Sequence, residues 1–425
     1  MTYFLNPAVK LHKRSVHGYG TINFITRDGV GDQPLVIDDR ALPIIEKLIL
    51  GKPYFPSDSD REILSRLEED GVVSKGDAKE NWHQPSAESL QFWIQTSDRC
   101  NLACTYCYIP SLNSKRTRRH DLFSLFSKKL LAVRGLKTIS IKLAGGEPLL
   151  SFRDWSGDVI KLKLTLADAG ITLNVRIITN LTFLNKEIVE YIKENNFGIS
   201  VSIDGLATYN DKSRIFPTSN RGSFQVVMRN LEILRANGIK PAVMVTATSE
   251  NADGMAELVE WLVNNDLVFR ISDAKGGYIR PDEFENSFVE VDKILSAPSR
   301  VGYPVSDRMV VSDLRTLSPQ ATPCSMGVSG GALYLDGSIY FCHTEFNDGT
   351  PLGTIDEDEN LVTIIRRGHS RHLGLSSECK ACEYRFICAG GCPLYRVNGK
   401  SPMCSAYKRI IPKIFDLYGK EGQNV

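Results

Sequence analysis

Hydrophobic residues from residue 86 onward gather in short β-rich runs that alternate with amphipathic helical stretches. The runs that predict strands are 92–96, 137–143, 172–179, 197–203, 240–247 and 267–271. Helical patterns lie near 121–134, 153–169, 185–195, 222–237 and 251–265. Strands that alternate with helices are typical of a parallel sheet covered by helices. We therefore predict an α/β fold of six β-α units, closed into a barrel or partial barrel.

The first 85 residues follow a different pattern. Short strands are predicted at 8–13, 20–26 and 33–37, helices at about 39–50 and 58–69, and a return strand at Gly71-Val72-Val73. This order predicts a small winged-helix-like module with an exposed sheet edge. A polar stretch, 75–88, reads as a linker. Residues 275–323 are less regular, and Leu335-Asp336-Gly337-Ser338 beyond them predicts a tight hairpin turn.

Composition narrows the class of protein. With 425 residues and 42% hydrophobic residues, the chain can bury one large core and one or two smaller modules. Lysine and arginine total 51 and acidic residues 50, so no global charge favours nucleic acid or a membrane surface. We find no export signal and no uninterrupted apolar span of about 18 residues. We expect a cytoplasmic protein with no nucleic-acid or membrane partner.

All ten cysteines fall into two spaced patterns. The first is Cys100-x3-Cys104-x2-Cys107. The second is Cys324-x12-Gly337-x4-Cys342, then Cys379-x2-Cys382-x5-Cys388-x3-Cys392, then Cys404. Short paired spacings in a large chain without an export signal favour metal over disulfides. Zinc remains a rival for the block from Cys379 to Cys392. Three cysteines on one tight loop, without a fourth ligand nearby, suit a [4Fe-4S] cube with one open iron, so iron–sulfur clusters are favoured.

The remaining unusual motifs all follow predicted strands. In chain order they are Cys100–Cys107, Gly145-Gly146-Glu147-Pro148, Thr179-Asn180, Ser202-Ile203-Asp204-Gly205, Thr246-Ala247-Thr248, and Ser272-Asp273 with Gly276-Gly277. In parallel barrels the loops after the strands meet at one end and carry the chemistry. We expect these six loops to converge on one mouth.

The cysteine triplet with aromatic Tyr106, followed by Gly-Gly-Glu-Pro, resembles the signature of the radical S-adenosylmethionine superfamily. The resemblance implies a partial (β/α)6 barrel in which the open iron binds the amino and carboxylate groups of S-adenosylmethionine. Reduction by a partner such as flavodoxin or ferredoxin cleaves this cofactor to methionine and a 5′-deoxyadenosyl radical. That radical removes a hydrogen atom from the substrate.

The same resemblance implies a set of cofactor contacts. They are Tyr106, Gly145, Gly146, Glu147, Pro148, Thr179, Asn180, Ser202, Asp204 and Arg214. Several have a structural alternative: Glu147-Pro148 can start a helix, Asn180 can cap one, Asp204-Gly205 can form a turn, and Arg214 can be a solvated surface residue. The sequence names no catalytic side chain.

The seven later cysteines resemble the SPASM domain of radical enzymes that modify peptides or proteins. By that resemblance Cys379, Cys382, Cys388 and Cys404 hold an outer auxiliary cluster, and Cys324, Cys342 and Cys392 hold an inner one. Ser318 and Pro319 occupy the region where some relatives have a further cysteine. The inner cluster would then take its fourth ligand from another group or from substrate. Auxiliary clusters can accept an electron, or they can have the structural role of holding a small domain together.

The N-terminal module resembles, on 35–40, 61–64 and 71–73, the peptide-recognition element of ribosomal peptide maturases. A leader peptide would add a strand to its edge; the alternative is a stabilising appendage. The basic run 115–120 beside the barrel mouth fits either a leader contact or a solvated loop.

These resemblances divide the chain into a recognition module (1–85), a radical SAM barrel (86–275), and a linker with SPASM domain (276–425). They imply three [4Fe-4S] clusters and a maturase that oxidatively modifies a ribosomally made precursor peptide, through a carbon–carbon, ether or thioether cross-link. A sulfatase-type maturase that forms formylglycine and a non-catalytic electron carrier are the rivals.

Overall fold

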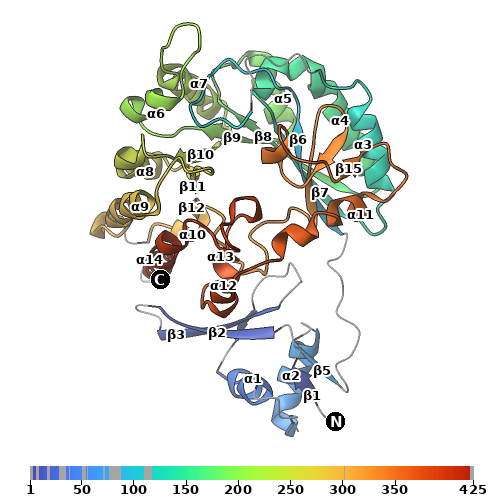
Figure 1. Ribbon diagram of the computed structural model, residues 1–425, viewed down its shortest axis with the longest axis vertical. Helices are drawn as coiled ribbons and strands as arrows, with labels where there is room; N and C mark the ends of the chain where they lie inside the picture. Colours follow the sequence, from blue (N-terminus) through green and yellow to red (C-terminus); the bar gives the residue numbers. More distant parts are fainter. Residues whose placement is uncertain are drawn as a thin grey trace.

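The computed structural model shows a larger and a smaller body of secondary structure (Figure 1). It describes residues 3–5, 9–16, 20–27, 35–37, 39–49, 54, 56–69, 72–75, 88–109, 117–300 and 302–421. Gly71, most of the predicted linker, and Lys115 and Arg116 of the basic run lie outside the described residues.

A ten-stranded sheet forms the larger body, in the order β12-β11-β10-β9-β8-β7-β6-β13-β14-β15. Its strands are β6 (Ser89–Gln95), β7 (Thr138–Ala144), β8 (Thr172–Thr179), β9 (Gly198–Ser202), β10 (Ala242–Ala247), β11 (Val268–Asp273), β12 (Met309–Val311), β13 (Gly330–Leu333), β14 (Ser338–Tyr340) and β15 (Gly353–Thr354). Strands β6 to β12 pair in parallel with their neighbours. The six predicted barrel strands and their parallel α/β arrangement are confirmed.

Helices pack on the outside of this sheet, as Figure 1 shows. The five predicted ones are α3 (Leu122–Leu131), α4 (Phe152–Asp168), α5 (Lys186–Asn195), α7 (Phe224–Ala236) and α8 (Met255–Asn264). Alternation along β7 explains the packing: Ile139, Ile141 and Leu143 are buried in the core beneath the helices, whereas Ser140 and Lys142 lie on the opposite face of the strand.

One helix contradicts the expectation of irregular structure in 275–323. Helix α9 (Pro281–Leu295) begins with proline at its first turn and buries Phe284, Phe288, Val291 and Leu295. Those residues recur at helical spacing, so the signal was present in the sequence. Packing stabilises this helix, because α9 lies against α8 and the C-terminal helix α14 (Cys404–Glu421).

The C-terminal region continues from the barrel sheet. Strand β13 pairs in parallel with β6 and antiparallel with β14, which confirms the predicted hairpin turn. At that turn Gly337 has φ of 96°, a conformation that favours glycine. Short helices α11 (Leu361–Arg366), α12 (Ser377–Ala381) and α13 (Arg385–Cys388) follow and lead to α14.

The N-terminal module contains an antiparallel sheet of β2 (Val9–Val16), β3 (Gly20–Arg27) and β4 (Leu35–Ile37). A second pair joins β1 (Tyr3–Leu5) to β5 (Val73–Lys75). Helices α1 (Leu42–Ile49) and α2 (Arg61–Glu69) contribute Ile45 and Leu64 to a separate small core. In Figure 1, β2 and β3 lie beneath the C-terminal region. The winged-helix-like reading of this module stays a prediction.

Candidate active site

The cysteine triplet lies on the loop that follows β6. The thiols of Cys100, Cys104 and Cys107 are close enough for their charges to interact. The backbone of this loop is held by hydrogen bonds from the Ala103 and Thr105 amides to the carbonyls of Ile215 and Ser213, at 2.9 and 3.2 Å. The loop is therefore anchored to a segment that lies more than 100 residues later in the sequence.

The Gly-Gly-Glu-Pro loop after β7 packs directly against the start of the cysteine loop. A Cβ atom on Gly145 would lie 2.2 Å from the Ser97 carbonyl oxygen, and one on Gly146 would lie 2.3 Å from that of Arg99. The Gly146 amide donates to the Ser97 carbonyl at 2.7 Å. Both glycines are required by this close approach of two backbones, in addition to the predicted approach of a cofactor.

Glu147 is fully buried and joins two loops of the mouth, those after β7 and β8. Its carboxylate accepts hydrogen bonds from the Thr179 hydroxyl at 2.6 Å, the Asn180 amide at 2.7 Å and the Leu149 amide at 2.9 Å. Burial raises the pKa of Glu147 to about 7, although these hydrogen bonds oppose the shift. Pro148 also fixes the loop, because its carbonyl accepts from the Trp155 indole at 2.9 Å.

Asn180 connects the loop after β8 to the first cysteine. Its side-chain amide donates to the Asn101 side chain at 3.2 Å and lies 3.6 Å from the Cys100 sulfur. Thr182 completes this group by donating its hydroxyl to the Asn180 side chain at 2.6 Å. The predicted residue Asn180 thus lies at the cysteine loop, and the sequence analysis missed Asn101 and Thr182, which hold it there.

Asp204 and Arg214 form a buried ion pair beside Cys104. Arg214 Nε donates to Asp204 Oδ2 at 2.6 Å, and Tyr106 donates its hydroxyl to the same carboxylate oxygen. Arg214 Nη1 also lies 3.9 Å from the Cys104 sulfur. Burial alone would lower the pKa of Arg214, but Asp204, Tyr106 and Cys104 raise it well above its usual value. The solvated-surface alternative for Arg214 is wrong, since only 7% of the residue is exposed.

Ser202 and Asn251 lie at the loops after β9 and β10, and Asn251 holds the two together. Ser202 ends β9 and is half-buried. Asn251, fully buried, donates to the carbonyls of Asp204 at 2.9 Å and Thr246 at 2.8 Å. No sequence pattern singled out Asn251, because its partners are brought to it by the parallel pairing of the strands.

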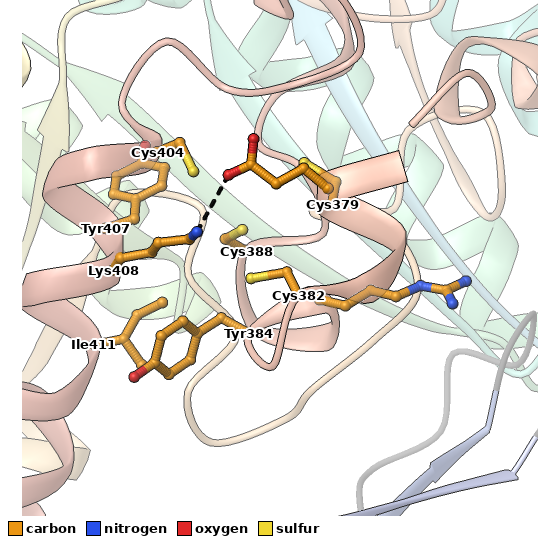
Figure 2. Close-up of a pocket in the computed structure, with 11 residues that line it drawn as sticks. Cys379, Cys382, Tyr384, Cys388, Cys404, Tyr407, Lys408 and Ile411 are labelled. Carbon is orange, nitrogen blue, oxygen red and sulfur yellow. Dashed lines mark hydrogen bonds and ion pairs between the residues drawn. The ribbon is translucent and has the colours of Figure 1, made fainter. Parts of the chain in front are cut away.

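Four of the later cysteines face one another between α12, α13 and the start of α14. Figure 2 shows the sulfur atoms of Cys379, Cys382, Cys388 and Cys404 around one pocket. Lys408 lies at the edge of this group and forms an ion pair with Glu378 at 3.3 Å. These are the four residues predicted to hold the outer cluster.

Cys324, Cys342 and Cys392 form a separate group whose charges interact with one another. Arg396 lies between the two groups: its charge interacts with Cys392 and Cys324 and also with Cys379 and Cys388 of the outer group. The Arg396 guanidinium donates to backbone carbonyls at 2.8 to 3.2 Å. The sequence analysis did not single out Arg396.

The donor sets fit iron–sulfur clusters better than single zinc ions. In the described ranges, no group of three or more His, Cys, Asp or Glu side chains converges as ligands of one metal ion do. Thiolates of a [4Fe-4S] cube bind separate irons, so they lie farther apart. Burial raises the pKa of Cys100, Cys324 and Cys392 to about 12 and that of Cys388 to about 11. Such thiols ionise readily only when a metal supplies positive charge.

The inner group lies next to the barrel strands and to the cysteine triplet. His343, adjacent to Cys342, stacks on Trp93 of β6 with ring centroids 3.7 Å apart. Tyr108, adjacent to Cys107, has its ring centroid 5.4 Å from that of His343, and its charge interacts with both Cys107 and Cys342. Tyr108 therefore lies between the first cysteine set and the inner one.

The described part of the basic run is engaged in ion pairs within the chain. Arg118 pairs with Asp158 at 2.9 Å. Arg119 pairs with Asp121 at 2.6 Å and with Asp356 of the C-terminal region at 2.7 Å. These contacts hold Arg118 against helix α4 of the barrel and place Arg119 at the join between barrel and C-terminal region. They leave the leader contact without support from these two residues.

Residues 94–262 match the family model described as the Radical SAM superfamily. The chain therefore contains a radical SAM domain, and this domain holds the loops of Cys100, Glu147 and Asp204. Its fold is that of SPASM-type radical SAM enzymes.

Individual relatives agree with this class. A serine-type anaerobic sulfatase-maturating enzyme of Klebsiella aerogenes is 24% identical over 335 residues, which cover 74% of this chain and 82% of the relative. The structure of anSMEcpe with bound AdoMet and Cp18Cys peptide matches 77% of this chain and 97% of its own, at 20% identity and a TM-score of 0.63. Streptococcus suis SuiB bound to precursor peptide SuiA matches 95% of this chain and 98% of its own, at 14% identity and a TM-score of 0.55.

None of the described helices is long and apolar enough to span a membrane.

Proposed function

We propose that this protein is a radical S-adenosylmethionine maturase that oxidatively cross-links side chains of a ribosomally made precursor peptide. The observation that carries the proposal is the separation of ten cysteines into three groups, one of them on a radical SAM loop and another beside it across Tyr108. Three such groups provide ligands for three [4Fe-4S] clusters, about 12 irons per chain.

The bound cofactors would supply the radical that removes a substrate hydrogen atom and an acceptor for the second electron. The chain's own residues hold and orient them. We assign Tyr106, Ser202, Asp204 and Arg214 to one side of the S-adenosylmethionine site. Gly145, Gly146, Glu147, Pro148, Thr179 and Asn180 form the other side. The interlocked contacts of Glu147 and Asp204 keep both sides rigid, as a radical reaction requires.

The N-terminal module is assigned to leader-peptide recognition. The similarity in fold to anSMEcpe covers 77 to 79% of this chain, whereas that to SuiB extends over 95%. SuiB is described in complex with its precursor peptide. Strand β4 pairs with β3 on one side in the three-stranded sheet, so its other edge is suited to strand addition by an extended peptide.

A second candidate is a sulfatase-type maturase that oxidises one serine or cysteine to formylglycine. The curated relative named above favours it, since that enzyme matures sulfatases. Deletion of residues 1–85 separates the two functions. The leader-dependent enzyme would lose peptide modification while still cleaving S-adenosylmethionine, whereas the sulfatase-type enzyme would retain its activity.

The test is anaerobic co-expression with a short peptide encoded beside the gene, followed by tandem mass spectrometry of the peptide. Loss of two hydrogens per modification, with fragment ions missing between two linked residues, supports the cross-linking maturase and names the linked residues. Loss of two hydrogens with complete fragmentation, or conversion of one residue to an aldehyde, supports the second candidate. The matched control is Cys104→Ala, which should give neither modified peptide nor 5′-deoxyadenosine. If the wild-type holoenzyme forms no 5′-deoxyadenosine, both maturase functions are excluded. The remaining alternative is then a non-catalytic electron carrier.

A further inference from the structure

Basic side chains occupy the barrel-facing side of the sheet. In the strand register Lys142 of β7 lies between Trp93 of β6 and Arg176 of β8. Because side chains alternate along a strand, Lys142 lies on the face opposite to Ile141 and Leu143, which are packed beneath the helices. Directly paired residues of adjacent strands have neighbouring side chains, so Lys142 and Arg176 form a pair of like charges.

Three arginines act on Lys142. Burial, together with Arg270, Arg176 and Arg315, lowers the pKa of Lys142 to about 8, and Asp313 opposes the shift. Lys142 is half-buried and Arg176 is exposed, and like charges this close destabilise one another unless an anion joins them. An anion beside Lys142 and Arg176 would relieve this repulsion.

Asp313 is already engaged by other cations. It accepts a hydrogen bond from Arg270 at 2.9 Å and pairs with Lys275 at 3.4 Å. Asp273, close by, pairs with Lys275 at 2.9 Å and accepts from the Tyr407 hydroxyl at 2.7 Å. These two carboxylates balance Arg270 and Lys275.

Of the remaining cations, Arg315 and Arg176 donate hydrogen bonds to neutral oxygen atoms. Arg315 donates to the Pro323 carbonyl at 3.0 Å and lies beside Cys324, where it balances the charge of the inner thiolates. Arg176 donates to the Ser200 hydroxyl at 3.3 Å. Over the described ranges of the chain, neither Lys142 nor Arg176 has a carboxylate partner.

The pair lies close to the loops assigned to the cofactor. Lys142 lies three residues before Gly145, and Arg176 lies three residues before Thr179, so both are below loops assigned to the cofactor. His343, which follows Cys342, is also influenced by the charge of Lys142. Lys142 thus lies between the cofactor loops and the inner cysteine group.

We propose that Lys142 and Arg176 bind a carboxylate of the substrate peptide and so select an acidic group close to the modified residue. This inference rests on the proposed function. An arginine binds a carboxylate through two parallel hydrogen bonds, and the lysine adds a third charge-assisted bond. The carboxylate would come from an aspartate or glutamate side chain or from the C-terminus of the peptide.

Competitive acetylation of the anaerobic holoenzyme tests this site without requiring turnover. Acetic anhydride would be added with or without a millimolar probe, and acetylation of Lys142 would be followed by mass spectrometry. The probes are N-acetyl-glutamate α-amide for a side-chain carboxylate, N-acetylglycine for a terminal carboxylate, and the neutral N-acetyl-glutamine amide. Lys137, which is exposed, serves as the internal control in each sample.

We expect at least one carboxylate probe to slow acetylation of Lys142 by roughly threefold or more, without effect on Lys137. The probe that protects better shows whether the site prefers a side-chain or a C-terminal carboxylate. Arg176→Met should abolish the protection, whereas Arg153→Met, which alters an exposed arginine paired with Glu187, should retain it. The proposal is overturned if neither carboxylate protects, if the neutral amide protects equally, or if S-adenosylmethionine alone protects as well. These results stand whether or not the co-expressed peptide is modified.

Discussion

Arg214 Nε lies 2.6 Å from Asp204 Oδ2, and both side chains are almost completely removed from solvent. The pair joins the loop after β9 to the cysteine loop, because Tyr106 donates to the same carboxylate and Arg214 reaches the Cys104 sulfur. A further hydrogen bond from the Thr246 amide to Asp204 Oδ1, at 2.8 Å, adds the end of β10, where the next loop begins. One carboxylate thus fixes three of the loops that form the site.

Asp204→Ala should therefore destabilise the protein and reduce cofactor cleavage together. Removal of one partner of a buried ion pair leaves an uncompensated charge and typically costs about 3–5 kcal/mol. Thermal unfolding and 5′-deoxyadenosine formation by the reconstituted enzyme measure the two effects. Asp154→Ala is the control, since Asp154 is 62% exposed and its pair with Arg99 should contribute little. Equal behaviour of the two variants would contradict the assigned role of Asp204.

Glu147 predicts a pH dependence of stability. Its pKa is raised from 4.5 to about 7 by burial, so the folded protein binds this proton more tightly than the unfolded chain does. The resulting stabilisation is fully present below pH 4.5 and is lost as the pH rises through 7, up to about 3 kcal/mol in total. Melting temperatures between pH 5 and 8 should fall less in Glu147→Gln than in the wild type. Parallel pH profiles of the two proteins would count against this interpretation.

Gly145 and Gly157 provide a matched pair of glycine-to-alanine substitutions. Gly145→Ala would force a Cβ atom to within 2.2 Å of the Ser97 carbonyl oxygen and should displace the cysteine loop. Gly157, in α4, has no atom within 4 Å of the added Cβ, so Gly157→Ala should leave stability unchanged or raise it by up to about 1 kcal/mol. Iron content and melting temperature should fall only in Gly145→Ala. A tolerated alanine at 145 would show that the two loops can separate.

The three cysteine groups predict separable losses of iron. Cys382→Ala should remove about four irons from the outer group, and Cys104→Ala about four from the first group. Only Cys104→Ala should abolish reductive cleavage of S-adenosylmethionine in the absence of peptide, as measured by 5′-deoxyadenosine. Iron analysis combined with Mössbauer spectroscopy distinguishes this result from loss of all clusters. Zinc in the outer group, found by metal analysis, would revise its assignment.

The barrel elements and the closely spaced cysteines could be read from the sequence because both are local signals. Strand β8 spans the same residues, 172–179, as the apolar run that predicted it. The short spacing of Cys379 and Cys382 places their thiols together. Helix α9 was missed although its apolar residues are helically spaced. Its surroundings of glycine and proline residues obscured the pattern.

Tertiary structure decided what no local pattern contains. Asp204-Gly205 fits a turn in sequence, and Arg214 fits a surface residue. Only the parallel pairing of β9 and β10, and the return of the segment after α6 (Ala207–Ser213) to the cysteine loop, bury them as partners. Likewise, Lys142 and Arg176 lie 34 positions apart and meet because two strands pair in one register. The sequence by itself determined the elements and the ligand types, because those depend on nearest neighbours along the chain. The charges and hydrogen bonds of the site depend on contacts across strands and loops, and these exist only once the sheet has formed.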